Sequence, residues 1–263
     1  MAGATIDPLF SAETAIDANL PGALRRLAAG TSAIVRWPNL CDGGPDGLSR
    51  SITSATFEPY DVSRLDPPIL KVGPAVYDHY TRGAVGGDYW HEAGEARARM
   101  SAMFGGVDPA DLLLQRLSRC LSLPVRPASI RGRDLHVGIL REFTSGSRIH
   151  YDEISREFPG HFDVEPIVQL AFNLHLTAAA SGGALTVWRH RWVPGDDKAR
   201  DGYGWAEDLL VGTSSATLLA MPGDGVFFDC RNFHKVDDFA GGRRVTFSFF
   251  LGFTISGELI AWS

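Results

Sequence analysis

The sequence has little cysteine, no block of basic residues and no long apolar run. Its three cysteines, Cys41, Cys120 and Cys230, are widely spaced and form no Cys-x-x-Cys motif. Neither a zinc knuckle nor a disulfide framework is therefore indicated. We expect three reduced thiols, as is usual for a cytoplasmic protein.

The charge pattern excludes further classes of protein. The formal net charge is −6, and arginines occur singly or in pairs, which argues against binding to a nucleic-acid backbone. No apolar stretch approaches the roughly 20 residues that a membrane-spanning helix needs. The N-terminal residues lack the basic start and apolar core of a signal peptide. We therefore expect a cytoplasmic protein with no nucleic-acid or membrane partner; the sequence leaves the oligomeric state open.

The two halves of the chain differ in their hydrophobic pattern. Apolar residues recur at helical spacing in 11–29, 91–104 and 109–123, and Asp108-Pro109 is a typical helix start. Apart from a short strand at 32–38, strand-like segments dominate only after residue 134, where Gly, Pro or Asp turns separate them. These predicted strands are 134–143, 165–176, 182–193, 215–222, 225–230 and 243–253.

A large block of strands behind a helical region favours a mainly β fold with helical support. We expect a jelly roll or double-stranded β-helix. The predicted organisation is a single domain, 1–263, in which 1–133 form a helical region with the first strands. Residues 134–253 would form the β-helix core and 254–263 a C-terminal tail.

The segment SRIHYDE contains a His-x-Asp motif at the end of a predicted strand. Because side chains alternate along a strand, His150 and Asp152 share one face and can reach a single divalent cation. A second histidine from far along the chain would complete a 2-His-1-carboxylate triad, which leaves sites open as non-haem Fe(II) oxygenases require. His234, in MPGDGVFFDCRNFHKV, fits that role because a turn, an apolar strand and a short loop precede it.

Arg244 lies ten residues after His234, at the start of the last clear strand. Alternation places Arg244, Thr246 and Ser248 on one face and three apolar side chains on the other. An arginine surrounded by hydroxyl groups inside a barrel needs an anion, and a dicarboxylate held by its far carboxylate would satisfy it. Arg243 is the rival for this position, and the pattern favours Arg244.

His-x-Asp, a distant His and an Arg about ten residues later together resemble the Fe(II)/2-oxoglutarate-dependent oxygenases of the double-stranded β-helix superfamily. LREFTSGSRIHYD, SGGALTVW and MPGDGVFF are similar to further segments of that family, so the resemblance covers residues 134–253. The region before it and the QLAFNLHL strand look like a bacterial subgroup. That subgroup contains hydroxylases of N-acyl amino acids and free-standing halogenases and hydroxylases of natural products.

The resemblance implies a set of roles for individual residues. His150, Asp152 and His234 would bind Fe(II), and Arg244 would bind the C5 carboxylate of 2-oxoglutarate, with Thr246 or Ser248 adding a hydrogen bond. Asn173 and Arg141 are candidates for the other end of the co-substrate or for the substrate. Candidates for substrate contact are Tyr77, Tyr80, Trp90, Glu153 and His175.

The same resemblance implies hydroxylation with O2 as oxidant and with release of succinate and CO2. Halogenases of the superfamily have glycine or alanine in place of the metal-binding carboxylate, whereas this chain has Asp152. The expected substrate is an amino-acid derivative or an intermediate of secondary metabolism. Desaturation or ring closure by the same chemistry, a non-catalytic ligand-binding β-helix and a zinc hydrolase remain as alternatives.

Overall fold

Strands make up most of the regular structure. The computed structural model describes residues 7–40, 52–53, 55–60, 67–82 and 85–263, with the backbone alone at 80–82. The strands are β1 (Ala12–Thr14), β2 (Ile34–Trp37), β3 (Glu58–Pro59), β4 (Ile69–Val72), β5 (Val125–Pro127), β6 (Ser129–Ile130), β7 (Arg133–Asp134), β8 (Ile139–Phe143), β9 (Pro166–His175), β10 (Ser181–Gly182), β11 (Leu185–Arg191), β12 (Arg200–Asp201), β13 (Gly204–Trp205), β14 (Ser215–Leu218), β15 (Gly225–Phe228), β16 (Asn232–Val236), β17 (Phe239–Ala240), β18 (Arg244–Thr254) and β19 (Leu259–Trp262). The helices are α1 (Leu20–Ala28), α3 (Gly87–Met103), α4 (Pro109–Leu121) and α5 (Ile154–Glu157), with 3-10 helices η1 (Val76–Arg82), η2 (Pro194–Ala199) and η3 (Glu207–Leu210).

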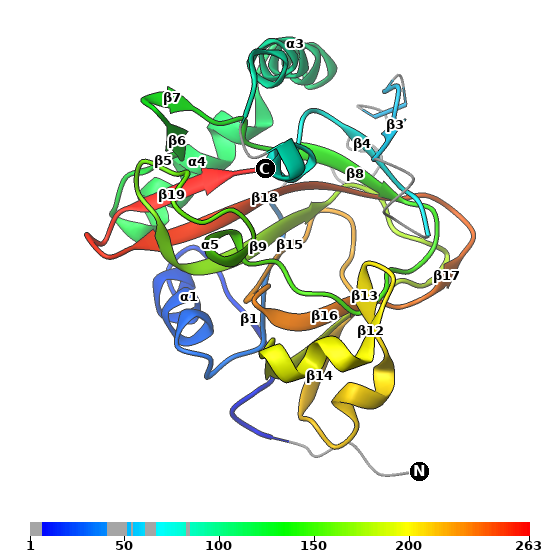
Figure 1. The fold of residues 1–263 in the computed structure, drawn as a ribbon. Helices are drawn as coiled ribbons and strands as arrows, with labels where there is room; N and C mark the ends of the chain where they lie inside the picture. Colours follow the sequence, from blue (N-terminus) through cyan, green and yellow to red (C-terminus); the bar gives the residue numbers. More distant parts are fainter. Residues whose placement is uncertain (1–6, 41–51, 54, 61–66, 83–84) are drawn as a thin grey trace.

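Two sheets facing each other form the body of the molecule (Figure 1). The larger sheet has ten strands. Its main path is β1-β2-β15-β9-β18-β8-β4-β3; β19 pairs with β18, and β5 pairs with β19. The smaller sheet has the order β14-β11-β16. Leu185 and Val187 of β11 pack against Ala171 of β9 and Val226 and Phe228 of β15, so the two sheets share a core.

The outer face of the larger sheet is covered by helices α1 and α4. Leu24 of α1 and Leu117 of α4 belong to the same core cluster as Phe172, Phe227 and Phe249 of the sheet. Because side chains alternate along each strand, the neighbours of these phenylalanines point the other way, between the two sheets. One face of the sheet therefore supplies the core, and the other face is left to build a site.

The predicted helices form, but the first of them is shorter than expected. The helix expected at 11–29 begins only at Leu20, because Ala12–Thr14 pairs in parallel with β2. Pro21 then lies in the first helical turn, where its missing N–H breaks no hydrogen bond. Helix α4 begins as expected after Asp108, whose side chain accepts a hydrogen bond from the N–H of Ala110 at 2.9 Å.

Residues 254–263, predicted to be a tail, instead contribute a strand. β19 pairs antiparallel with β18 and parallel with β5, and it lies beside β18 in Figure 1. Trp262 is 1% exposed. Its ring meets that of Phe162 edge-on, with 5.2 Å between the ring centroids, and lies tilted against that of Phe250 at 5.7 Å. The run LIAW was too short to stand out in the sequence, and only its partners in the sheet define it.

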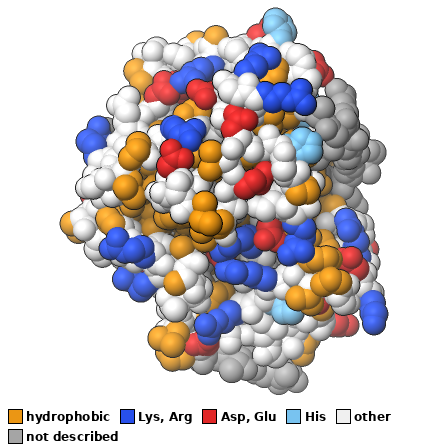
Figure 2. Space-filling model, turned by 60° about the vertical axis from the view of Figure 1, so that its left-hand side comes forward, with side chains coloured by type: hydrophobic (Ala, Val, Ile, Leu, Met, Phe, Trp, Pro, Cys, Tyr) orange, Lys and Arg blue, Asp and Glu red, His pale blue; other side chains and the backbone are white. Residues whose placement is uncertain are grey.

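Charged side chains of both signs are interspersed over the face shown in Figure 2, with hydrophobic side chains singly or in small groups between them. Within the described residues, no helix combines the length and the apolarity that crossing a membrane requires. Cys120 and Cys230 are free thiols, as expected, and Cys41 lies outside the described residues.

We expect Trp262→Ala to lower the free energy of unfolding by about 3–5 kcal/mol, because it removes a large buried side chain and leaves a cavity. Chemical denaturation followed by circular dichroism measures this change. Ile255→Ala is the matched control, since Ile255 is 88% exposed and should change stability by less than about 0.5 kcal/mol. Equal stability of Trp262→Ala and the parent protein would contradict a structural role for β19.

Candidate metal centre and its two cavities

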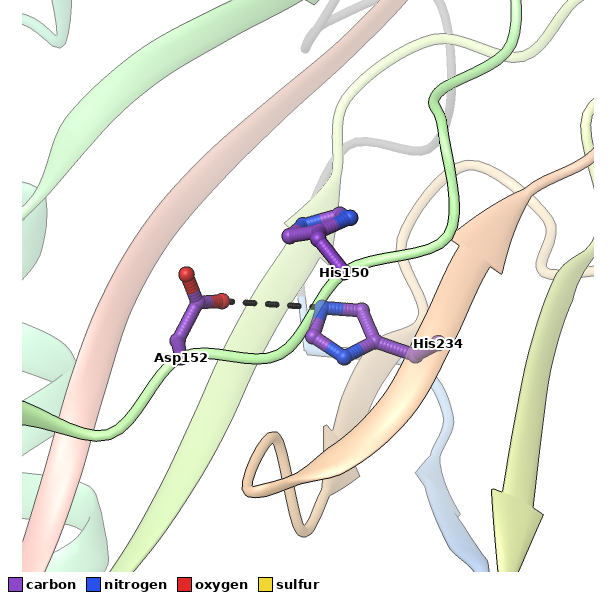
Figure 3. Close-up of side chains that lie close together, drawn as sticks. All are labelled: His150, Asp152 and His234. Atoms are coloured by element: carbon purple, nitrogen blue, oxygen red, sulfur yellow. Dashed lines mark ion pairs between the residues drawn. The ribbon is translucent and has the colours of Figure 1, made fainter. Parts of the chain in front are cut away.

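His150 and His234 are held opposite each other by a pair of backbone hydrogen bonds. The N–H of His150 donates to the carbonyl of His234 at 3.0 Å, and the N–H of His234 donates to the carbonyl of His150 at 2.8 Å. Two residues further on, the N–H of Asp152 donates to the carbonyl of Cys230 at 2.8 Å. The segment after β8 thus runs along β16, and the three side chains meet between them (Figure 3).

The three side chains form a compact set of ligand atoms. His150, Asp152 and His234 each offer one ligand atom, and these three atoms lie within 4.8 Å of one another. His234 Nε2 is 3.5 Å from Asp152 Oδ2. The Nδ1 atoms of the two histidines donate to the carbonyls of Arg148 and Asn232, at 2.8 and 3.0 Å. In a neutral imidazole whose Nδ1 carries the proton, Nε2 keeps a lone pair that can bind a metal. Two imidazole nitrogens and one carboxylate oxygen are the donor set of a facial triad, so the residues fit Fe(II).

The electrostatic surroundings favour the ligand forms of these groups. Burial, followed by the neighbouring His234, lowers the pKa of His150 to about 4. Burial alone would raise the pKa of Asp152, but the hydrogen bond from His234 and the charges of His150, His234 and Arg141 outweigh it and lower this pKa to about 2. At neutral pH the site therefore offers a neutral imidazole and an ionised carboxylate, as metal binding requires.

A small cavity of about 60 Å³ lies on the inner side of the triad, and Arg244 lines it. Arg244 is 5% exposed, its Nε donates to the carbonyl of Gly183 at 3.3 Å, and its guanidinium lies over the ring of Phe143. Gly183 has a φ of 78°, in the left-handed region that favours glycine, and a Cβ there would lie 3.3 Å from Arg244 Cδ. Burial lowers the pKa of Arg244 to about 10, so it stays positively charged. In the described part of the chain no carboxylate pairs with it, and a buried cation of this kind calls for an anion.

Strand register explains why polar groups gather around Arg244. Thr246 of β18 pairs with Arg141 of β8 on one side and with His175 of β9 on the other. Directly paired residues share a face of the sheet, so this row points between the sheets. Ser248 lies two residues after Thr246 on the same face of β18 and pairs with Asn173 of β9. The hydroxyl oxygens of Thr246 and Ser248 are 2.9 Å apart.

Arg243, the rival of Arg244, points out of the barrel. Its Nε and one terminal nitrogen each donate to the carboxylate of Glu142 at 2.7 Å, and its side chain is 44% exposed. Of the two arginines, Arg244 is therefore the one that lies inside the barrel.

A larger cavity of about 400 Å³ also borders His150 and Asp152 of the triad. This volume lies within the range of about 300–1,000 Å³ that is typical of small-molecule sites. His150, Asp152 and Arg141 line both cavities, so the two meet at the metal centre. Arg141 donates from Nε to the hydroxyl of Tyr60 at 3.0 Å, and no carboxylate pairs with Arg141 among the described residues.

The candidates for substrate contact have mixed outcomes. Tyr77 lines the large cavity, and His175 lines the small one beside Arg244. Trp90 does not line either cavity; it packs on Tyr89 and under the guanidinium of Arg133, 4.2 Å from its ring centre. Glu153 also lies outside them, because its carboxylate pairs with Arg156 at 2.9 Å. The side chain of Tyr80 lies outside the described residues.

Two charged residues that line the large cavity were not predicted from the sequence. Glu157 lies in the short helix α5 and lines the cavity. Arg200 comes from β12, more than 40 residues further along. Only the spacing of Glu157 from Asp152 could have suggested a position near the metal, and nothing in the sequence around Arg200 marks it.

Comparison with known proteins identifies the family. L-γ-glutamyl-L-propargylglycine hydroxylase of Streptantibioticus cattleyicolor is 39% identical over 244 residues, which span 90% of this chain and 90% of that protein. Leucinostatins biosynthesis cluster protein S of Purpureocillium lilacinum is 30% identical over 207 residues, 74% of this chain and 83% of that protein. No protein-family model matches the chain.

Solved structures show the same fold. An N-substituted L-amino acid dioxygenase from Burkholderia ambifaria, in complex with α-ketoglutarate, superimposes with a TM-score of 0.60 at 14% sequence identity. The match covers 93% of this chain and 91% of that structure. The predicted double-stranded β-helix with helical support is confirmed. Together with the hydroxylase relative and the triad, it shows that the chain belongs to the Fe(II)- and 2-oxoglutarate-dependent dioxygenases.

We expect His150→Ala and His234→Ala each to weaken Fe(II) binding by more than the 10- to 100-fold that the loss of an outer-shell partner typically costs. The reason is that each variant removes a ligand atom outright. Anaerobic calorimetric titration with Fe(II) measures the change. His91→Ala is the control, because the side chain of His91 is 80% exposed and far from this cluster in sequence; an equal loss there would argue against a specific site.

Proposed function

We propose that this chain hydroxylates a C–H bond of an amino-acid derivative, with 2-oxoglutarate and O2 as co-substrates. The single observation that carries the proposal is the position of Arg244. It is a buried cation with no carboxylate partner among the described residues, in a small cavity that also opens on His150 and Asp152. The proposal assigns Fe(II) to His150, Asp152 and His234.

The chain's own residues would hold the two organic molecules in two cavities that both border His150 and Asp152. Arg244 binds the C5 carboxylate of 2-oxoglutarate as a charge-assisted pair, and Thr246 adds a hydroxyl from the same row. Asn173 and His175 line the rest of that cavity. The substrate occupies the large cavity, whose apolar walls keep water away from the reacting C–H bond.

Fe(II), when bound, supplies the activation of O2, by which 2-oxoglutarate becomes succinate and CO2 and one oxygen atom enters the substrate as a hydroxyl group. The protein contributes the ligand geometry and the position of the C–H bond. Desaturation or ring closure would begin with removal of the same hydrogen, so analysis of the product by mass spectrometry separates these outcomes from hydroxylation.

The similarity to L-γ-glutamyl-L-propargylglycine hydroxylase supports an amino-acid derivative as substrate. The charges around the large cavity agree with such a molecule, because Arg141, Glu157 and Arg200 line it together with Asp152. We therefore expect succinate to form when the Fe(II)-loaded protein is given 2-oxoglutarate, O2 and γ-glutamyl dipeptides. If neither succinate nor a visible charge-transfer band with Fe(II) and 2-oxoglutarate appears, the proposal fails.

We expect Arg244→Lys to raise the apparent Kd for 2-oxoglutarate by about 10- to 100-fold, because lysine cannot form the bidentate pair with a carboxylate. The intensity of the charge-transfer band during an anaerobic titration measures this Kd. Arg243→Lys is the matched control, since the neighbouring arginine points outward to Glu142. A larger effect at position 243 than at position 244 would contradict the assignment.

A further inference from the structure

Glu157 places a carboxylate on the wall of the large cavity without a basic partner. Its Oε2 accepts a hydrogen bond from the N–H of Glu153 at 3.2 Å. Within the described residues, no lysine or arginine forms an ion pair with it, in contrast to Glu153, which pairs with Arg156. The mechanism above leaves this acidic group unused.

Arg200 places the opposite charge on the wall of the same cavity. Its guanidinium lies over the ring of Trp205, 5.1 Å from the ring centre, and its Nε donates to the carbonyl of Gly202 at 3.4 Å. No carboxylate pairs with Arg200 among the residues that the structure describes. A guanidinium group and a carboxyl group thus face one cavity without forming an ion pair in the described part of the chain.

We propose that Glu157 and Arg200 bind the free α-ammonium and α-carboxylate groups of an amino-acid head group on the substrate. The enzyme would then select substrates whose amino group is unblocked and would discriminate against their N-acyl counterparts. This inference rests on the proposed function, because it assigns one end of the molecule whose other end reaches the metal.

The surroundings of Glu157 favour a cationic ligand. Burial, followed by the charge of Asp152, raises the pKa of Glu157 to about 8; Glu153 adds to this rise, while the N–H of Glu153 and the charge of Arg200 oppose it. A carboxylate in such a place is stabilised when a positive charge comes to it. The ammonium group of a substrate supplies that charge, and the Arg200 guanidinium then meets the adjacent carboxylate.

Glu157 also contributes to local structure, and the variant must separate the two roles. The hydrogen bond from the N–H of Glu153 needs only an acceptor oxygen at position 157. Glutamine keeps that oxygen and removes the charge. Glu157→Gln therefore preserves the contact at the start of α5 and tests the charge alone.

The decisive experiment is anaerobic calorimetry of the Fe(II)·2-oxoglutarate form with L-γ-glutamyl-L-propargylglycine and with its N-acetyl derivative. We expect the parent protein to bind the free-amino compound at least about tenfold more tightly. Glu157→Gln should weaken binding of that compound by about 10- to 100-fold, as the loss of a charge-assisted contact predicts. Binding of the N-acetyl compound should stay unchanged.

Glu153→Gln is the matched control, because it removes a carboxylate of the same segment that points away from the cavity; it should keep the preference. Equal affinity of the parent protein for both compounds, no binding of the free-amino compound, or an unchanged preference in Glu157→Gln would overturn the inference. The charge-transfer band is recorded for each protein first. A normal band without any preference rejects the role of Glu157 and Arg200 alone, whereas a missing band in the parent protein rejects the proposed function as well.

Discussion

The two backbone hydrogen bonds between His150 and His234 join the segment after β8 to strand β16. They fix the relative height of the two imidazoles, and the bond from Asp152 to Cys230 fixes the carboxylate beside them. The side chains add a second level of control, because each Nδ1 is held by a carbonyl two residues earlier in its own segment. The metal site is thus positioned by main-chain geometry, which tolerates changes in the surrounding side chains.

The triad separates two cavities with different chemistry. The small one is closed and contains a buried cation, so it suits a small dianion. The large one is mostly apolar and carries charges of both signs, so it suits a zwitterionic molecule with an apolar chain. The two organic molecules would then lie in separate cavities that meet at His150 and Asp152.

Much of the site could be predicted from the sequence because it depends on alternation along strands. His150 and Asp152 are two residues apart, and so are Arg244, Thr246 and Ser248; period-two geometry orders each set without knowledge of the fold. The block of strands after residue 134 indicated the fold, and the turn, apolar strand and short loop before His234 indicated the second histidine; the family resemblance then supported both. The strand containing His234 was missed, since NFHKV is short and its pairing with β11 is non-local.

The remainder could not be predicted because it depends on tertiary packing. Glu153 and Glu157 lie in one short polar segment, and only the four-residue helix α5 decides which of them faces the cavity. Trp90 was an aromatic candidate for substrate contact, but its ring packs against the guanidinium of Arg133 instead. The C-terminal strand β19 was not predicted, because its four residues form a strand only by pairing with β18 and β5.

Adjacent arginines at the start of β18 have opposite surroundings, one inside the barrel and one paired with Glu142 on the outside. A shift of the strand by one residue would exchange them and would also turn Val245 and Phe247 inward. The pairing of β18 with β8 and β9 holds the register that keeps Arg244 inside. The hydrogen bonds of this strand thus select which of two identical side chains meets the co-substrate.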